Sequence, residues 1–265
     1  MTTRLFAEVT GPDSGLPPVL LLHSLGLDHT MWRSCLPFLA ADRRVIAADL
    51  PDHGGSPSAE DGGAELIRLL DDAGAADAHV VGVSLGGNEA LALAARAPDR
   101  VRSVTAAGSF ASLDEPERAA KLVATARRAS TLGMSRFADA YVTETLAPRA
   151  RRSDGPRLRE VLAGTPLEAY TAAARRCFAT DLRPLLPRIG CPVLLLVGRH
   201  DTRTPRSCAE RIAAGLANPQ IEEIPAAGHL ANLDAPQIFA VSVRTFWSAL
   251  ERPAAPDGRA HHRSG

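Results

Sequence analysis

Short runs of apolar residues alternate along the chain with longer stretches in which apolar residues recur every three or four positions. The runs predict buried strands, and the longer stretches predict helices that pack on them. The predicted strands are residues 4–10, 18–23, 44–48, 80–83, 101–107, 192–198 and 221–224. Because strands and helices alternate from the start, we expect an α/β fold with a mostly parallel sheet and helices on both faces.

Helix signals surround these strands and take over completely after residue 107. Around the sheet we expect helices over 28–39, 64–73, 204–216 and 234–250. Asp28, Thr204 and Asp234 are expected to cap three of them, and Pro37 should end or kink the first. Strand signals then disappear for about seventy residues, and capping boxes at Ser112 and Thr165 suggest helix starts. We therefore expect a helical lid of four helices over residues 109–180, inserted into a core made of residues 1–108 and 181–251. Residues 252–265 have no apolar anchor and are predicted to be a disordered tail.

Composition narrows the range of partners. Thirty basic and thirty acidic side chains cancel, so no positive field favours nucleic acid or an acidic membrane surface. No apolar run approaches the roughly 20 residues of a membrane span. A small-molecule substrate is the expected partner, without nucleic acid or membrane, and a homo-oligomer stays open.

The four cysteines bear on metal binding and on compartment. Cys35, Cys177, Cys191 and Cys208 are scattered without the spacing of metal ligands, and no charged-then-apolar leader precedes the first predicted strand. We expect no metal site and a reducing, cytoplasmic location.

One stretch carries the clearest chemical signal. In Gly82-Val83-Ser84-Leu85-Gly86, a serine stands between two glycines where an apolar strand passes directly into an Ala- and Leu-rich helix. This is the pattern of a nucleophile elbow, in which the glycines allow a tight turn and the serine projects beyond the sheet. Ser84 is the predicted nucleophile.

A base and an acid follow two later strands. Asp201 comes directly after the predicted strand 192–198, and His229 follows the last predicted strand. Parallel strands end at one edge of a sheet, so we expect both side chains near Ser84. His229 would take the proton of the serine, and Asp201 would orient the imidazole.

Other histidines are weighed against His229. His200 neighbours Asp201 but is expected to line a loop, and His79 starts the elbow strand and is expected to be partly exposed. His53 stands in a Gly- and Pro-rich loop, and we interpret it as a loop-stabilising side chain.

The segment after the second strand supplies the candidate oxyanion hole. His23 and Ser24 stand where a sharp loop can turn a backbone N–H toward a substrate held at Ser84. We assign the oxyanion hole to the N–H groups of Leu25 and Leu85, and we take His23 and Ser24 as candidate substrate contacts.

Together these motifs resemble the α/β-hydrolase family, and the match runs from about Arg4 to Leu250. Asp49-Leu50-Pro51-Asp52-His53-Gly54-Gly55-Ser56 is similar to the family's Asp-x-x-Gly-x-Gly-x-Ser loop, with Asp52 in place of a glycine. More narrowly, four stretches resemble 3-oxoadipate enol-lactonases: 23–28 with Met31-Trp32, Leu132-Gly133-Met134, 180–184, and 229–232.

The resemblance implies a serine hydrolase that opens a lactone or small ester through an acyl-enzyme, without a cofactor. Such an enol-lactone belongs to aromatic-compound catabolism and carries a carboxylate. Twelve basic residues against eight acidic ones give residues 109–180 a net charge of +4. The expected partners of a substrate carboxylate are the lid arginines Arg127, Arg128, Arg175 and Arg176.

Two other classes of function stay open at this point. The same fold and the same three side chains support carbon–carbon bond hydrolysis or a non-hydrolytic cyclase or isomerase reaction, because function resides in the site. The second class is a non-catalytic protein that binds a ligand in the same pocket. Neither composition nor spacing separates these from ester hydrolysis.

Overall fold

The computed structural model describes residues 4–252, and seven strands form its sheet. In chain order they are β1 (Ala7–Thr10), β2 (Val19–Leu22), β3 (Val45–Ala48), β4 (Ala78–Val83), β5 (Val101–Ala107), β6 (Val193–Gly198) and β7 (Pro219–Ile224). They lie in the order β1-β3-β2-β4-β5-β6-β7. Only the β1–β3 pair is antiparallel, so the predicted mostly parallel sheet is confirmed.

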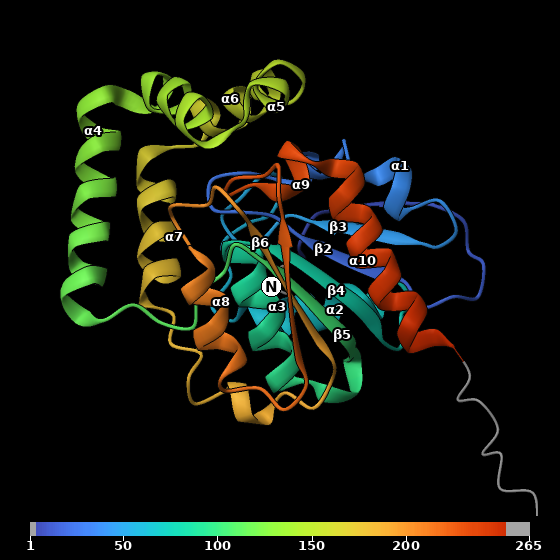
Figure 1. Cartoon of the computed structure of the whole chain (residues 1–265). Helices are drawn as coiled ribbons and strands as arrows, with labels where there is room; N and C mark the ends of the chain where they lie inside the picture. The colour runs from blue at the N-terminus through green and yellow to red at the C-terminus, as the bar shows by residue number, and fades with distance from the viewer. Residues whose placement is uncertain (1–3, 253–265) are drawn as a thin grey trace, which may run out of the picture.

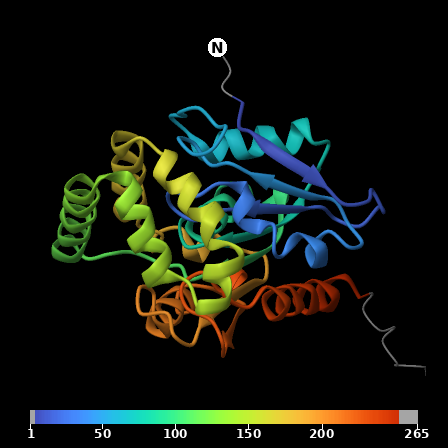
Figure 2. The same ribbon diagram turned by 90° about the horizontal axis from the view of Figure 1, so that it is seen from above.

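Helices cover both faces of the sheet (Figures 1 and 2). One face is packed by α1 (Leu36–Leu39) and α10 (Pro236–Glu251), and the other by α2 (Gly62–Asp72), α3 (Leu85–Arg96) and α8 (Arg206–Ala213). Successive strand side chains point to opposite faces. Leu21 thus joins the core under α10, whereas its neighbour Leu20 joins the core under α3.

A helical insertion lies between β5 and β6 and projects beside the sheet (Figure 1). It consists of α4 (Glu115–Thr145), α5 (Pro148–Ser153), α6 (Gly155–Gly164) and α7 (Leu167–Ala179), and α4 packs on α6 and α7. Gly133 interrupts α4, with φ 72° and ψ 153°. Four helices match the number expected, whereas the limits 109–180 and the lid role stay predictions.

The continuous helix expected over residues 28–39 is wrong, because two shorter pieces take its place and the break lies before Pro37, the residue expected to end or kink the helix. Asp28 does cap the first, a 3-10 helix η1 (His29–Trp32), by accepting a hydrogen bond from Thr30 N. The second, α1, begins only at Leu36. Pro37 lacks an N–H and fits the first turn of a helix rather than its middle, so the chain starts a new helix there.

Four expected side-chain caps are also absent. α4 begins after Asp114 rather than Ser112, and α7, α8 and α10 begin after Pro166, Pro205 and Ala235, all without a side-chain cap. These side chains bond elsewhere. Thr165 Oγ1 donates to Val161 O, Thr204 Oγ1 donates to Asp201, and Asp234 accepts from the N–H of Gly228.

The last helices of the described chain end close to the residues expected. α8 stops at Ala213, short of the expected residue 216, and α10 runs to Glu251. Of the predicted tail 252–265, residues 253–265 lie outside the described residues. Within residues 4–252, none of the helices has the length and apolar character needed to cross a bilayer.

Candidate active site

Ser84 occupies a sharp turn between β4 and α3. Its backbone has φ 56° and ψ −114°, an unusual conformation for a residue with a side chain. The turn depends on its glycines, because a Cβ atom at Gly82 would lie 2.1 Å from the carbonyl oxygen of Gly86. The local sequence therefore forces the hydroxyl of Ser84 out beyond the end of the sheet, as the elbow pattern predicts.

The structure brings the three predicted side chains together at the carboxyl edge of the sheet. Ser84 Oγ lies 3.1 Å from His229 Nε2, and His229 Nδ1 lies 2.9 Å from Asp201 Oδ2. With Nδ1–H donating to the carboxylate, Nε2 is left free to accept the proton of the serine.

Asp201 is itself held by several donors. Its Oδ1 accepts from the N–H groups of Arg203 and Thr204, and its Oδ2 accepts from Thr204 Oγ1 at 2.6 Å. Burial alone raises the pKa of Asp201, but hydrogen bonds from His229 and Thr204 outweigh it and hold the pKa below its usual value. The carboxylate is therefore charged at neutral pH.

Two backbone N–H groups near Ser84 are free of the usual partners. Leu85 is the first residue of α3, so its N–H has no acceptor within the helix. In the described chain, the N–H of Leu25 makes no backbone hydrogen bond. Leu25 and Ser84 line one cavity. Their role as an oxyanion hole stays a prediction.

His23 holds this loop in place and does not line the cavity. Its Nε2 accepts from Leu50 N at 2.8 Å, and its Nδ1–H donates to the carbonyl of Ser24 at 2.8 Å. The ring is fully buried, and burial lowers its pKa well below the ordinary value, so it is neutral. Ser24, in contrast, does line the cavity.

The cavity beside Ser84 has a volume of about 270 Å³ and is both polar and cationic. Four residues that carry hydroxyl groups, Ser24, Thr125, Tyr141 and Tyr170, line it together with apolar residues such as Phe110. Its charged neighbours besides His229 are both basic: Lys121 from α4, and Arg203 from the loop after β6. No acidic residue lies among the residues described in its lining.

The four predicted arginines lie away from this cavity. Arg127, Arg175 and Arg176 line a separate groove between α4 and α7. Arg128 pairs with Glu144, and Arg176 pairs with Asp52. Arg128 is likewise absent from the cavity lining. The +4 charge of the insertion therefore does not locate the cations that face Ser84.

Asp52 explains how the chain tolerates the loss of a family glycine. It has a positive φ of 65°, a region that aspartate enters more easily than most residues with side chains. Its side chain accepts from Ser58 Oγ and from Arg176 of α7. The substitution thus adds a link between the 49–56 loop and the insertion.

The other histidines have structural surroundings. His53 Nδ1 lies 2.9 Å from Pro51 O, which agrees with a loop-stabilising role, and His200 is exposed. His79 is only 1 % exposed, so its expected partial exposure is wrong. It stacks on Trp247, which covers the ring. The described residues contain no group of three His, Cys, Asp or Glu side chains that could hold a metal ion.

Comparison with known proteins places this geometry in a family. A model described as the alpha/beta hydrolase fold matches residues 17–236. The chain belongs to the α/β-hydrolase family. This α/β-hydrolase is 34 % identical over 257 residues to the pimeloyl-[acyl-carrier protein] methyl ester esterase of Neisseria meningitidis, covering 89 % of this chain and 94 % of that protein.

Lactonases are also among the similar α/β-hydrolases. 3-Oxoadipate enol-lactonase 1 of Acinetobacter baylyi is 29 % identical over 248 residues, covering 89 % of this chain and 90 % of that protein. The crystal structure of the enol-lactonase from Burkholderia xenovorans LB400 has a TM-score of 0.82 and 28 % identity, covering 92 % of this chain and 96 % of that one. The resemblance to enol-lactonases is thus confirmed, beside an equally clear likeness to an esterase.

Proposed function

We propose that this α/β-hydrolase is a serine hydrolase that cleaves a lactone or small carboxylic ester through an acyl-enzyme. The observation that carries the proposal is the chain of contacts from Ser84 Oγ to His229 Nε2 and from His229 Nδ1 to the carboxylate of Asp201. A serine hydroxyl is a poor nucleophile unless a neighbouring base accepts its proton, and this arrangement supplies that base.

In the proposed reaction, Ser84 Oγ attacks the substrate carbonyl carbon while His229 takes its proton. The N–H groups of Leu25 and Leu85 stabilise the negative charge on the former carbonyl oxygen. His229 then gives the proton to the leaving alkoxide, which in a lactone stays attached to the acyl group. A water molecule, deprotonated by His229, attacks the acyl-enzyme and releases the acid.

We further propose that the substrate carries a carboxylate. In the described part of the chain, Lys121 and Arg203 are the two Lys or Arg residues that line the cavity, and they take the place of the four insertion arginines as the expected partners of the carboxylate. A cavity of about 270 Å³ favours a compact substrate. A carboxylated enol-lactone of aromatic catabolism meets both conditions, and two of the similar proteins are named as enol-lactonases.

The residues that the helical insertion contributes to the cavity support a role for the insertion as a lid over this site. Lys121, Tyr141 and Tyr170 all reach the cavity from the insertion, whereas Ser84 and His229 reach it from the core. We therefore propose that α4 and α7 select the substrate and limit the access of water.

The test is a turnover screen that includes 3-oxoadipate enol-lactone, small methyl esters, aryl esters, thioesters and diketones. We expect turnover of a lactone or ester by the wild-type protein, with a burst of chromophore from an aryl ester, and loss of both in Ser84→Ala. Cleavage of diketones alone would favour carbon–carbon bond hydrolysis. Binding without turnover of any compound would favour the ligand-binding alternative.

A further inference from the structure

One carboxylate joins the loop that carries His229 to the helical insertion. Asp234 stands at the end of α9 (Ala231–Asp234). Its Oδ2 accepts from the N–H of Gly228 at 2.8 Å, and its Oδ1 accepts from the N–H of Ala147 at 2.7 Å. Gly228 directly precedes His229, and Ala147 directly precedes α5.

The same junction of α4 and α5 also reaches the loop of the acid. Arg203 donates to Thr145 Oγ1 at 3.0 Å, and its guanidinium lies 5.2 Å from the ring centroid of Tyr141. The backbone N–H of Arg203 meanwhile donates to Asp201 Oδ1. The end of α4 and the start of α5 therefore hold the loops of both His229 and Asp201.

The charge of Asp234 is compensated by the dipoles of two backbone N–H groups rather than by a neighbouring cation. Among the described residues, no Lys or Arg lies within ion-pair distance of this half-buried carboxylate. Burial raises the pKa of Asp234, and the N–H groups of Gly228 and Ala147 and the charge of His229 oppose that rise. The other charged groups around His229 are Asp201, Lys121 and Arg203.

We propose that Asp234 is a positioning residue for His229: it fixes the backbone before the base and favours the protonated imidazole that forms during the reaction. The catalytic meaning of this position rests on the proposed function. The position itself does not, because it follows from the two hydrogen bonds that Asp234 accepts. Through Ala147, the carboxylate also makes the placement of the base depend on the helical insertion.

The test uses the full chain and the variants Asp234→Asn and Asp234→Ala. The first readout is the pKa of the His229 imidazole, measured by NMR titration without substrate. Removing a nearby negative charge disfavours imidazolium, so we expect the pKa of His229 to be lower in both variants than in the wild type. The second readout is ester turnover, where we expect about a tenfold loss in kcat with KM nearly unchanged, because the base is misplaced.

The matched control is Asp154→Asn. Asp154 and Asp234 both line a cavity between α5 and the start of α10. Asp154 accepts from Ser34 Oγ and Ser153 Oγ, and among the described residues no hydrogen bond joins it to the loop of His229. We expect its variant to keep the pKa of His229 and kcat. A folded Asp234→Ala protein with the wild-type pKa at His229 would overturn the proposal. A shifted pKa in a protein that hydrolyses none of the esters would instead overturn the proposed function and leave the positioning role standing.

Discussion

The main chain of Leu22 occupies the space that a side chain at Gly86 would need. A Cβ atom built on Gly86 lies 2.1 Å from the carbonyl oxygen of Leu22 and 2.7 Å from that of His23. Real Cβ atoms do not approach so closely, and the two obstacles are backbone atoms that cannot rotate away. The elbow of Ser84 and the end of β2 are therefore fixed against one another at this glycine.

Gly86→Ala is expected to lower the free energy of unfolding by about 3 kcal/mol, because α3 must shift away from β2. Gly164→Ala is the control, since no atom lies within 4 Å of a Cβ at that position and its φ is not positive. That variant should be unchanged or up to about 1 kcal/mol more stable. Urea unfolding measures both, and equal stability of the two variants would contradict the argument.

Lys121→Met is expected to raise KM about tenfold for an ester or lactone that carries a carboxylate, and to leave a neutral ester of the same length unchanged. The physical reason is the loss of one cation from a cavity whose lining, over residues 4–252, contains no acidic residue. Steady-state kinetics with the paired substrates measures the effect. The wild-type preference for the anionic substrate should also weaken as salt is added.

Arg127→Met tests whether any basic residue of the insertion would give the same result. Arg127 lines the groove between α4 and α7 instead of the cavity beside Ser84. We expect its variant to treat both substrates as the wild type does. An equal effect of the two substitutions would mean that the anion is drawn by the general charge of the insertion.

The elbow and its partners could be predicted because each depends on a local rule. Gly82 and Gly86 are needed where a strand turns sharply into a helix, and this requirement is visible in five residues. Asp201 and His229 follow apolar strands, and parallel strands end at one edge. Topology alone therefore brings them near Ser84. This agrees with the distances of 3.1 Å from His229 Nε2 to Ser84 Oγ and 2.9 Å from His229 Nδ1 to Asp201 Oδ2.

The lining of the cavity could not be predicted in the same way. Which face of a helix in the insertion points inward depends on how α4 and α7 pack, and the break at Gly133 shifts the periodicity of α4. Arg127 and Lys121 lie on one helix, yet only Lys121 reaches the cavity. The sequence predicts a helix cap at Asp234 because nothing in it shows that the N–H groups of Gly228 and Ala147 approach this carboxylate.

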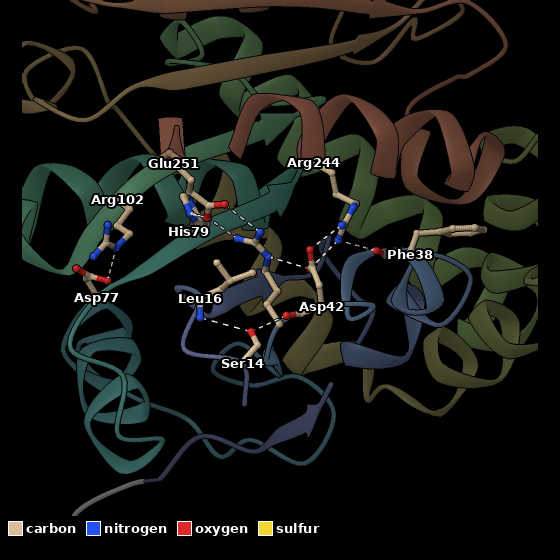
Figure 3. A network of polar contacts seen from close by, with 11 residues as sticks. Ser14, Leu16, Phe38, Asp42, Asp77, His79, Arg102, Arg244 and Glu251 are labelled. Carbon is tan, nitrogen blue, oxygen red and sulfur yellow. Dashed lines mark hydrogen bonds and ion pairs between the residues drawn. The ribbon is translucent and has the colours of Figure 1, made fainter. Parts of the chain in front are cut away.

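Glu251→Gln is expected to lower the free energy of unfolding by about 3 kcal/mol. Glu251 stands at the end of α10, and Figure 3 shows it beside His79. Its carboxylate accepts two hydrogen bonds from Arg43, whose side chain is only 3 % exposed and lies over the ring of Trp247. The substitution removes one of the two carboxylates that Arg43 contacts and leaves the buried guanidinium with Asp42, whose Oδ1 lies 3.2 Å from Arg43 Nε. Chemical unfolding at pH 7.5 measures the loss.

Asp77→Asn is the control for Glu251→Gln. Asp77 pairs with Arg102 nearby (Figure 3), but the side chains of Arg102 and Asp77 are 49 % and 29 % exposed. Such pairs contribute less than about 1 kcal/mol. A loss of the same size in both variants would show that the burial of Arg43 does not matter.

His79→Phe is expected to reduce the dependence of stability on pH between 7.5 and 5. Burial lowers the pKa of His79 to about 4, although Glu251 favours the charged form. The folded chain thus binds this proton less readily than the unfolded chain, whose histidine titrates near 6.5. The stabilising effect of the neutral ring is complete above about pH 6.5 and is lost as the pH falls toward 4. From pH 7.5 to 5 this amounts to about 2 kcal/mol.

The measurement is urea unfolding of the wild type and His79→Phe at both pH values. The variant loses hydrogen bonds to Ser103 and Glu251, so it should be less stable at pH 7.5. It should then lose about 2 kcal/mol less than the wild type on going to pH 5. His200→Gln, a change at an exposed ring, should follow the wild type. Parallel pH curves for His79→Phe and the wild type would mean that the buried ring accepts its proton as easily as a histidine in water.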